Sequence, residues 1–320
     1  MAGVVSVGGW RLVQQQLVQP VEAADATVTI HAPAKLNLSL AVLEKRSDGY
    51  HDIESLMVPV TLHDTLHVTP KNEPGISLRV RWGGRLARID SSFSGDVPAG
   101  PGNLVVKAVE ALARAAGVER GLEIDLLKHI PAGAGLGGGS SDAAAVLQAA
   151  ADAWQIDWPI ERLSALGATL GSDIPWFFAG GPATVSGRGE RVRQVEGIPP
   201  LPAVIVKPSF GLSTAAVYRE CRPDASRSGD ADHLAGALRR GLRAAIPLMH
   251  NALEAPARSL APEVDRLLGD LRRAGGLHPM LTGSGSACFV ITRTVVEARH
   301  IAARIEALGW PAVFPVRLCA

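Results

Sequence analysis

A glycine-rich stretch between Pro131 and Asp142 is the segment whose residue types most directly suggest chemistry. An alanine-rich run with helical spacing follows it and extends to Trp154. Glycine lets backbone N–H groups approach a ligand closely, and the N-terminus of a helix favours negative charge. The stretch therefore predicts an anion cradle, with phosphate as the expected anion. Its residues are Pro131, Ala132, Gly133, Ala134, Gly135, Leu136, Gly137, Gly138, Gly139, Ser140, Ser141 and Asp142.

Three well-known phosphate loops do not fit the residues around this cradle. Gly133, Gly135 and Gly138 have the spacing of a dinucleotide-binding loop, which needs a second parallel strand and an acidic residue about 20 positions on. Here Asp157 and Pro159 lead into another helix instead. No Lys-Ser or Lys-Thr pair follows the glycines, as a P-loop requires, and the H-R-D and D-F-G motifs of protein kinases do not occur.

Other stretches have residues suited to binding or catalysis. Alternating apolar residues from Leu36 to Val42 are typical of a strand, and their period of two puts Lys35 and Asn37 on one face. The remaining candidates are a turn-type stretch, a short polar stretch and a second small-residue loop: Arg46 to His51, Gly171 to Pro175 and Thr282 to Ser286.

Composition limits the class of protein. With 320 residues the chain is long enough for two domains. Lys plus Arg (32) nearly balance Asp plus Glu (31), so the charge does not indicate a nucleic acid or an acidic membrane as partner. No apolar run approaches the ~18 to 20 residues of a membrane span. Three widely spaced cysteines predict reduced thiols. We therefore expect a cytoplasmic protein with a small-molecule partner, and neither a nucleic-acid nor a membrane partner.

The chain divides into an extension and two predicted domains. Residues 1–25 have no basic residue ahead of their short apolar stretch, so we expect a loose N-terminal extension and not a secretory signal. A cluster of prolines at 199, 200 and 202 is the best linker. It separates a first domain, 26–198, from a second, 199–320.

Strands and helices that position these residues follow from periodicity and capping. Asn103 is a suitable N-cap and Gly117 a suitable C-cap for the helix between them. The expected strands are 28–42, 53–60, 66–69, 76–80, 122–127, 203–206, 280–291 and 312–318. The expected helices are 104–116, 143–154, 160–170, 296–308, and most of 233–274 with breaks at prolines.

Three of the stretches, taken in order, resemble the motifs of the galactokinase, homoserine, mevalonate and phosphomevalonate (GHMP) kinase superfamily. Pro33-Ala34-Lys35-Leu36-Asn37-Leu38 is similar to its first motif, the glycine-rich stretch to its ATP-binding motif, and Leu281 to Cys288 to its third. The resemblance implies an α+β fold of two domains. The first is like ribosomal protein S5 domain 2, and the second is ferredoxin-like.

The resemblance narrows within the superfamily. Arg46 to His51, the double serine after the glycines, and Gly171-Ser172-Asp173-Ile174-Pro175 are similar to the branch of the non-mevalonate isoprenoid pathway, and the resemblance covers residues 27–318. It implies ATP-dependent phosphorylation of the 2-hydroxyl of 4-diphosphocytidyl-2-C-methyl-D-erythritol. The alternatives are another GHMP kinase, of homoserine or mevalonate type, a non-catalytic ATP-binding module, and a dinucleotide-dependent oxidoreductase.

The resemblance also implies the catalytic and ATP-binding residues. Lys35 and Asp173 match a catalytic pair, with Asp173 taking the hydroxyl proton and Lys35 offsetting charge on the γ-phosphate. Residues 131–141 are expected to bind ATP. Asn103 lies near adenine or only caps its helix. Ser140 or Ser141 either helps to hold Mg²⁺, with Ser141 the first choice, or is a plain N-cap.

The substrate-binding residues follow in the same way. The family holds cytosine between two aromatic rings, and Tyr50 and Tyr218 match them; a half-buried helix residue is the alternative for Tyr218. His51 is expected at the edge of the base. Further expected contacts come from Asn37, Thr214, Gly283 and Ser284. The loop that carries the last two is expected to meet the diphosphate or the acceptor sugar, and a tight strand bend is the alternative. We expect a monomer or a weak homodimer.

Overall fold

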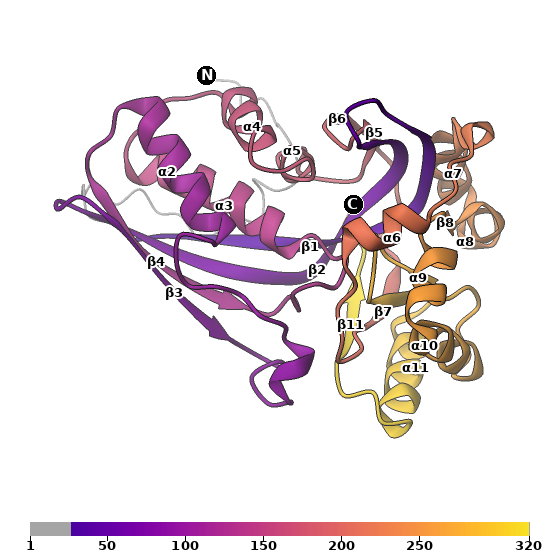
Figure 1. Cartoon of the computed structure of the whole chain (residues 1–320). Helices are drawn as coiled ribbons and strands as arrows, with labels where there is room; N and C mark the ends of the chain where they lie inside the picture. The colour runs from indigo at the N-terminus through magenta and orange to yellow at the C-terminus, as the bar shows by residue number, and fades with distance from the viewer. Residues whose placement is uncertain (1–26, 320) are drawn as a thin grey trace, which may run out of the picture.

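Two β-sheets organise the chain in the computed structural model, which describes residues 27–319 (Figure 1). The first sheet has seven strands in the order β3-β4-β2-β1-β8, with β5 paired to β2 and β6 to β5, and the second has four strands in the order β11-β7-β10-β9. The extension predicted at residues 1–25 lies outside the described residues. The expected α+β fold is confirmed.

Two long antiparallel strands form the spine of the first sheet. β1 (Val28–Lys45) and β2 (His51–Lys71) are joined by the turn that was expected from residue 46 onwards. The runs predicted at 53–60 and 66–69 are parts of the single strand β2. The pairing of β1 with β2 shifts register between Pro33 and Lys35 and again between Asn37 and Ser39, so β1 bends where its polar side chains lie.

Shorter strands complete this sheet. β3 (Ile76–Trp82) runs parallel to β4 (Gly121–Lys128), and β5 (Ala183–Gly187) and β6 (Arg191–Gln194) form a hairpin on β2. β8 (His250–Asn251) comes from beyond the predicted domain boundary and pairs in parallel with β1. Residue 198 as the end of the first domain stays a prediction.

Four helices cover one face of the first sheet (Figure 1). They are α2 (Leu104–Ala116), α3 (Gly138–Ala153), α4 (Ile160–Ala168) and α5 (Ile174–Phe177); a 3-10 turn, η1 (Ser91–Phe93), precedes them. The alanines of α3 are buried against α2 and the sheet because their small side chains allow close approach. The predicted helix 104–116 is confirmed, with an Asn103 N-cap and a left-handed Gly117.

The second sheet has the strand order of a ferredoxin-like domain. β7 (Pro202–Val206), β9 (Met280–Leu281), β10 (Cys288–Ile291) and β11 (Val313–Arg317) lie in the order fourth, first, third, second, all antiparallel. Its helical segments are α6 (Thr214–Glu220), η2 (Ala225–Arg227), α7 (Asp230–Arg240), α8 (Leu242–Ala245), η3 (Ile246–Leu248), α9 (Glu254–Leu260), α10 (Pro262–Arg273) and α11 (Val295–Ala307).

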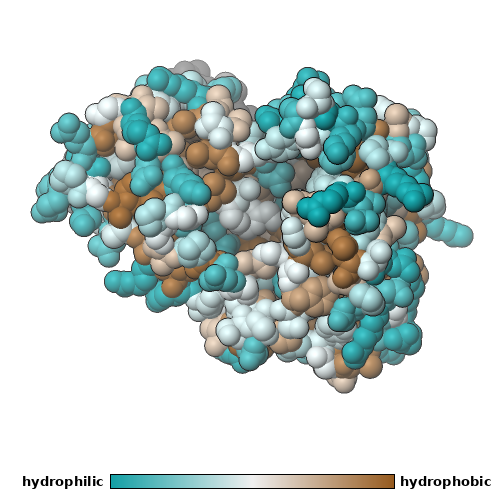
Figure 2. All heavy atoms as spheres, in the orientation of Figure 1, coloured by the Kyte–Doolittle hydropathy of each residue, from teal (hydrophilic) through white to brown (hydrophobic). Residues whose placement is uncertain are grey.

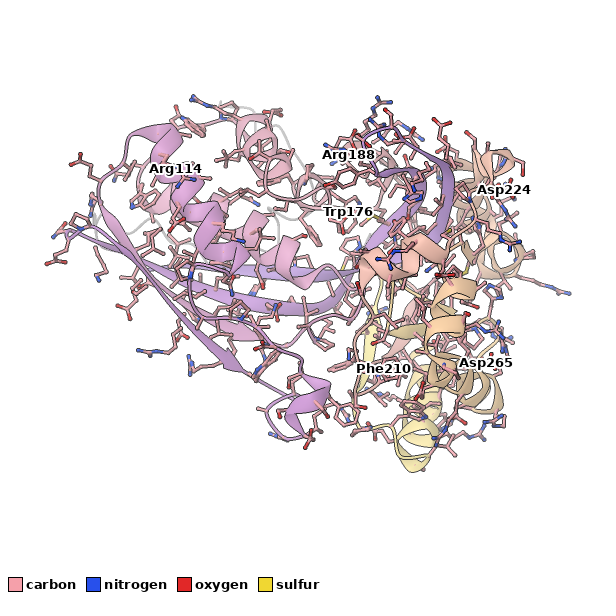
Figure 3. The ribbon with its side chains drawn as sticks, in the orientation of Figure 1. Arg114, Trp176, Arg188, Phe210, Asp224 and Asp265 are labelled. Atoms are coloured by element: carbon pink, nitrogen blue, oxygen red, sulfur yellow. The ribbon has the colours of Figure 1, made fainter. Side chains whose placement is uncertain are left out.

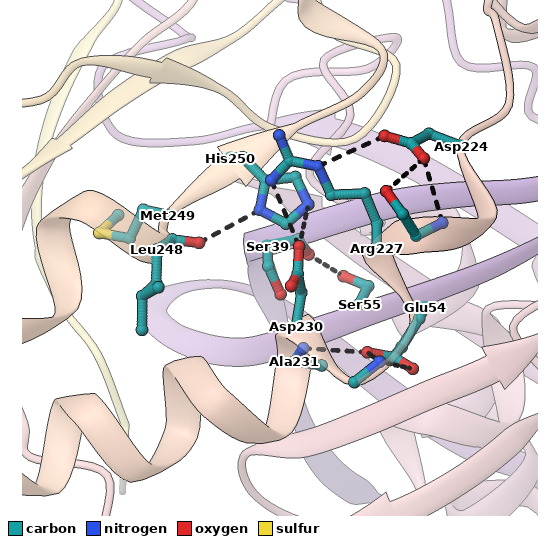
Figure 4. A network of polar contacts seen from close by, with 12 residues as sticks. Ser39, Glu54, Ser55, Asp224, Arg227, Asp230, Ala231, Leu248, Met249 and His250 are labelled. Carbon is teal, nitrogen blue, oxygen red and sulfur yellow. Dashed lines mark hydrogen bonds and ion pairs between the residues drawn. The ribbon is translucent and has the colours of Figure 1, made fainter.

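A polar network attaches α7 to the first sheet (Figure 4). No side chain of its own segment caps this helix, and Glu54 of β2 accepts hydrogen bonds from the backbone N–H groups of Gly229 and Ala231, each at 3.0 Å. Asp230 lies 3.6 Å from the His250 ring and 3.3 Å from the Arg227 guanidinium. The two parts of the chain are therefore joined by partly buried polar contacts as well as by apolar packing. None of the helices described here is long and apolar enough to cross a membrane.

Candidate active site

Lys35 lies where the glycine-rich loop meets β1. Its side chain is 3% exposed, and its ammonium donates hydrogen bonds to Asn37 Oδ1 at 2.5 Å and to the Gly135 carbonyl at 2.7 Å. Burial lowers the pKa of Lys35 to about 8, and the charge of Asp173 opposes that shift. A buried ammonium tied to the loop carbonyl can stabilise negative charge on a group held by that loop.

Asn37 extends this contact to the third motif. Its backbone N–H donates to Thr282 Oγ1 at 3.2 Å, and its amide donates to Ser55 Oγ at 2.8 Å. The Thr282 hydroxyl donates in turn to Asn37 Oδ1 at 3.4 Å. Lys35 and Asn37 therefore share one face of β1, as the period of two predicted, and they connect the three motifs.

Glycine is required where the two small-residue loops touch. Gly135 has a φ of +72°, and a Cβ added there would lie 2.1 Å from the Thr282 carbonyl oxygen. A Cβ on Gly283 would lie 3.0 Å from both the Gly135 carbonyl oxygen and Lys35 Nζ. Gly283 is buried and Ser284 is 9% exposed. The backbones of the two loops therefore meet above Lys35 with no room for side chains.

The glycine-rich loop leads into an N-terminus that no side chain caps. Pro131 to Gly137 form the turn between β4 and α3, and Gly137, with a φ of 72°, is the N-cap without a side-chain hydrogen bond. The helix begins at Gly138, five residues before the predicted start at 143, so neither Ser140 nor Ser141 is its N-cap. Free N–H groups at such an end favour an anion, and phosphate binding at this loop stays a prediction.

The two serines differ in exposure. Ser140 is half-buried, whereas Ser141 is 1% exposed and its hydroxyl has no hydrogen-bond partner among the described residues. The expectation of an N-cap role for either residue is wrong, because the helix starts earlier. A polar atom left without a partner next to the predicted phosphate site fits a role with a ligand.

Beneath the loop lies a buried ion cluster that sequence reasoning missed. The Lys128 ammonium donates to a carboxylate oxygen of Asp64 and, at 2.6 Å, to Asp142, and all three side chains are at most 3% exposed. Asp64 also accepts hydrogen bonds from the backbone N–H groups of His129 and Ile130, at 2.5 and 2.8 Å. Burial raises the pKa of Asp142 to about 8, against the attraction of Lys128. The cluster fixes both ends of the loop.

Asp173 is the N-cap residue of α5 and lies close enough to Lys35 for their charges to interact. It is half-buried, and no hydrogen bond or ion pair within the described chain joins it to Lys35, although its charge raises the pKa of that lysine. Phe177 of α5 packs beside Lys35, since a Cβ on Gly137 would meet both side chains at 2.9 and 3.1 Å. Asp173 is therefore placed near the ammonium with its carboxylate available.

Aromatic rings from the β1–β2 turn, the start of β2 and α6 form the next group of predicted residues. Tyr50 is 54% exposed, with the Arg188 guanidinium carbon 5.1 Å from its ring centroid. The His51 and Tyr218 rings are 5.3 Å apart and inclined by 31°. Burial raises the pKa of Tyr218, and the charge of Asp173 adds to that shift. Of the two tyrosines predicted to enclose a base, Tyr50 therefore lies next to Arg188 and Tyr218 lies next to His51.

The remaining predicted residues divide between the site and local structure. Thr214, the first residue of α6, shares a hydrogen bond of 2.8 Å with Ser284, which ties α6 to the third-motif loop. Asn103 caps α2 through Val105 N–H at 2.9 Å and donates to the Pro98 carbonyl at 2.6 Å. Its capping role is therefore present, and contact with adenine stays a prediction.

The surface is hollowed between the side carrying α2 to α5 and the side carrying α6 and the β5–β6 hairpin (Figure 2). Lys35, Asp173 and the uncapped N-terminus of α3 supply a cation, a carboxylate and an anion cradle to one region. This combination suits transfer of an anionic group to an acceptor that must lose a proton.

Family models and relatives agree with this architecture. The model described as GHMP kinases N terminal domain matches residues 103–181, and that described as GHMP kinases C terminal matches residues 233–309. A protein of Pelotomaculum thermopropionicum named 4-diphosphocytidyl-2-C-methyl-D-erythritol kinase is 42% identical over 87% of this chain and 93% of its own length. One of Rhodopirellula baltica with the same name is 38% identical over 90% and 94%.

A solved structure gives the same result. The crystal structure of a 4-(cytidine 5'-diphospho)-2C-methyl-D-erythritol kinase superimposes with a TM-score of 0.75 and 36% identity, covering 92% of this chain and 100% of that one. Identity of this extent runs through nearly the whole length of each pair of chains. The chain therefore belongs to the family of 4-diphosphocytidyl-2-C-methyl-D-erythritol kinases, within the GHMP kinases.

Proposed function

We propose that this chain transfers the γ-phosphoryl group of ATP to the 2-hydroxyl of 4-diphosphocytidyl-2-C-methyl-D-erythritol, giving the 2-phosphate and ADP. The reaction belongs to the non-mevalonate isoprenoid pathway. One observation carries the proposal: the family's three motifs meet at Lys35, which is bonded to Gly135 and, through Asn37, to Thr282. Relatives that bear the name of this kinase are 42% and 38% identical to the chain.

ATP is proposed to lie with its phosphates on the glycine-rich loop, residues 131–141. The loop offers backbone N–H groups at the uncapped N-terminus of α3, where the helix dipole adds to the attraction of an anion. Asn103, the N-cap of the neighbouring helix α2, is proposed to border the adenine. Because the Lys35 ammonium is bonded to Gly135 of this loop, it is proposed to lie beside the phosphates and not beside the base.

Asp173 is proposed as the base and Lys35 as the electrostatic partner. As the acceptor oxygen attacks the γ-phosphorus, its proton passes to the Asp173 carboxylate and the bond to the ADP oxygen breaks. The protonated Lys35 offsets the charge that develops on the transferred group. Among the described residues the Lys35 ammonium bonds Asn37 and Gly135 and not Asp173, so the carboxylate stays available to the hydroxyl.

The acceptor is proposed to extend from Asp173 towards the aromatic rings. Tyr50 and Tyr218 stack on the cytosine, and His51 hydrogen-bonds its edge. Tyr50 is exposed and so can accept a ring, and Tyr218 already packs against His51. Further contacts come from Asn37, Thr214, Gly283 and Ser284, of which Thr214 and Ser284 are hydrogen-bonded to each other.

Mg²⁺ is proposed to accompany ATP. Among the described residues no group of three or more His, Cys, Asp or Glu side chains has the arrangement of a metal site. Mg²⁺ that accompanies a nucleotide is generally held by its phosphates and by waters, with one or two protein oxygens. Ser141, whose buried hydroxyl lacks a partner, would be such an oxygen. When bound, the ion neutralises phosphate charge.

The localisation, oligomeric state and partners are proposed from the balanced charge of the sequence and from the family. We infer a cytoplasmic enzyme, monomeric or weakly dimeric, whose partners are small molecules and not nucleic acid or membrane. The domains are 26–198 and 199–320.

A coupled assay of ADP release tests the proposal. The purified chain is given ATP and Mg²⁺ with the cytidine substrate, homoserine, mevalonate or a sugar in turn. We expect ADP release with the cytidine substrate alone. Turnover of another acceptor in its place would overturn the substrate, and tight ATP binding without any ADP release would identify a non-catalytic module.

A further inference from the structure

The β5–β6 hairpin presents an arginine that no step of the proposed reaction yet uses. Its turn runs from Gly187 to Glu190, with left-handed glycines at 187 (φ +71°) and 189 (φ +116°) on either side of Arg188. The backbone N–H of Arg188 donates to Glu190 Oε2 at 2.7 Å, which holds the turn closed. In Figure 3 Arg188 lies on this hairpin, on the side towards α5. The turn therefore fixes the backbone position from which the Arg188 side chain extends.

This turn lies between the two ends of the proposed acceptor site. At one end, the Arg188 guanidinium carbon is 5.1 Å from the centroid of the Tyr50 ring. At the other end, a Cβ added to the next residue, Gly189, would lie 3.6 Å from Asp173 Oδ1 and 3.7 Å from the Ser172 carbonyl oxygen. Two successive residues thus lie next to the aromatic ring and next to the carboxylate.

The charge of Arg188 is less engaged than that of its neighbour Arg46. Arg46 donates to Asp48 at 3.1 Å and to Asp52 at 2.8 Å, so its guanidinium is committed to the turn that carries Tyr50. Within residues 27–319, Arg188 forms one ion pair, from its Nε to Glu190 Oε2 at 4.0 Å, and its side chain is 37% exposed. The Arg188 charge also acts on Asp48, whose pKa it helps to lower, but Asp48 is itself bonded to Arg46. A long, partly exposed cation without a close carboxylate contact among the described residues is available to an anionic ligand.

The chemistry of the acceptor supplies such an anion at this position. A nucleotide-linked sugar alcohol has its base at one end, its reacting hydroxyl at the other and a diphosphate between them. With the base at Tyr50 and the hydroxyl at Asp173, the diphosphate spans residues 188 and 189. We propose that Arg188 binds the diphosphate of the acceptor and so selects nucleoside diphosphate derivatives; this inference rests on the proposed function.

Binding of two cytidine compounds separates this role from a role at the base. Calorimetric titration of wild type and Arg188→Ala with CDP and with cytidine, in the absence of ATP, measures the contribution of the phosphates. Removal of a charge-assisted contact is expected to weaken CDP binding about tenfold or more and to leave cytidine binding within about twofold. Arg188→Lys keeps the positive charge but loses the forked guanidinium, so its affinity for CDP is expected to lie between those of wild type and Arg188→Ala. Arg193→Ala, on β6 and paired with Asp232, is the matched control.

Two results would overturn the inference: an equal loss for CDP and cytidine, which would mean that Arg188 acts only on Tyr50, and unchanged CDP binding in Arg188→Ala. Far-ultraviolet circular dichroism and a melting curve show whether each variant is folded. Turnover keeps this inference apart from the proposed function. If wild type phosphorylates the cytidine substrate and Arg188→Ala has an unchanged KM for it, only the arginine assignment fails. If wild type neither binds CDP nor turns over, the proposed function fails.

Discussion

At the scale of single residues, Lys35 combines burial with a required charge. Burial lowers its pKa to about 8, despite the charge of Asp173, because the ammonium has lost most of its water. The protonated form is the one that stabilises phosphate, so kcat/KM for ATP should fall as the pH rises through about 8. A profile from about pH 6 to about pH 10 checks this. Lys35→Met should have low activity that hardly changes over the pH range in which the wild-type activity falls. A wild-type profile that stays flat would contradict the assignment.

Asp173 is the second residue whose role can be separated from folding. It is half-buried and makes no side-chain cap for α5, so an amide can replace the carboxylate with little structural cost. Asp173→Asn is expected to lower kcat by about 10² to 10⁴, since the hydroxyl loses its base, while ATP affinity stays near wild type. Single-turnover rates and ATP titration measure the two effects. The exposed Asp157→Asn is the control, and a near-normal rate in Asp173→Asn would remove the proposed mechanism.

At the scale of elements, the site depends on two loops approaching without side chains. A Cβ on Gly135 would lie 2.1 Å from the Thr282 carbonyl oxygen, and its φ of +72° disfavours any other residue. Gly135→Ala should therefore lower the free energy of unfolding by about 1–3 kcal/mol and weaken ATP binding. Gly139→Ala is the control for stability, because a Cβ there meets nothing within 4 Å and the residue is helical. Urea unfolding of the two variants compares them, and equal stabilities would argue against the close approach.

Elements with strong local signals were predictable from sequence. The limits of α2 follow from a 3.6-residue period with Asn103 before it and Gly117 after it. The start of α3 was predicted at 143 but lies at Gly138, because tertiary packing overrides the low helix propensity of glycine. β8 has two residues and pairs with β1 from far along the chain, so no local pattern could reveal it.

Site residues that belong to a sequence motif were predictable, whereas residues brought together only by burial were not. Lys35 and Asn37 were found by period and motif, whereas the Asp64, Lys128 and Asp142 cluster was missed. A usable signal existed: Lys128 continues the alternating inward positions of β4 after Leu122, Ile124 and Leu126. A charge on the buried face of a strand needs a partner, but its identity depends on tertiary contacts that the sequence does not display.

At the scale of the whole molecule, one apolar core crosses the predicted domain boundary. Leu36 and Val58 of the first sheet belong to the same buried cluster as Ile205 and Phe289 of the second. The contacts of Lys35 and Asn37 with the two loops add polar links across the same junction. Each part alone would expose apolar residues at this junction. The two sheets should therefore unfold together, although the sequence suggests two domains.

A single calorimetric transition is thus expected, with the calorimetric enthalpy equal to the van't Hoff enthalpy. Phe289 is fully buried, so Phe289→Ala should cost about 3–5 kcal/mol and move the whole transition to lower temperature. Val296→Ala, on the 60% exposed position of α11, should leave the transition in place. Two separate transitions, of which Phe289→Ala moves only one, would show that each part unfolds on its own. In that case contacts at Lys35 would hold the site together without the support of a common core.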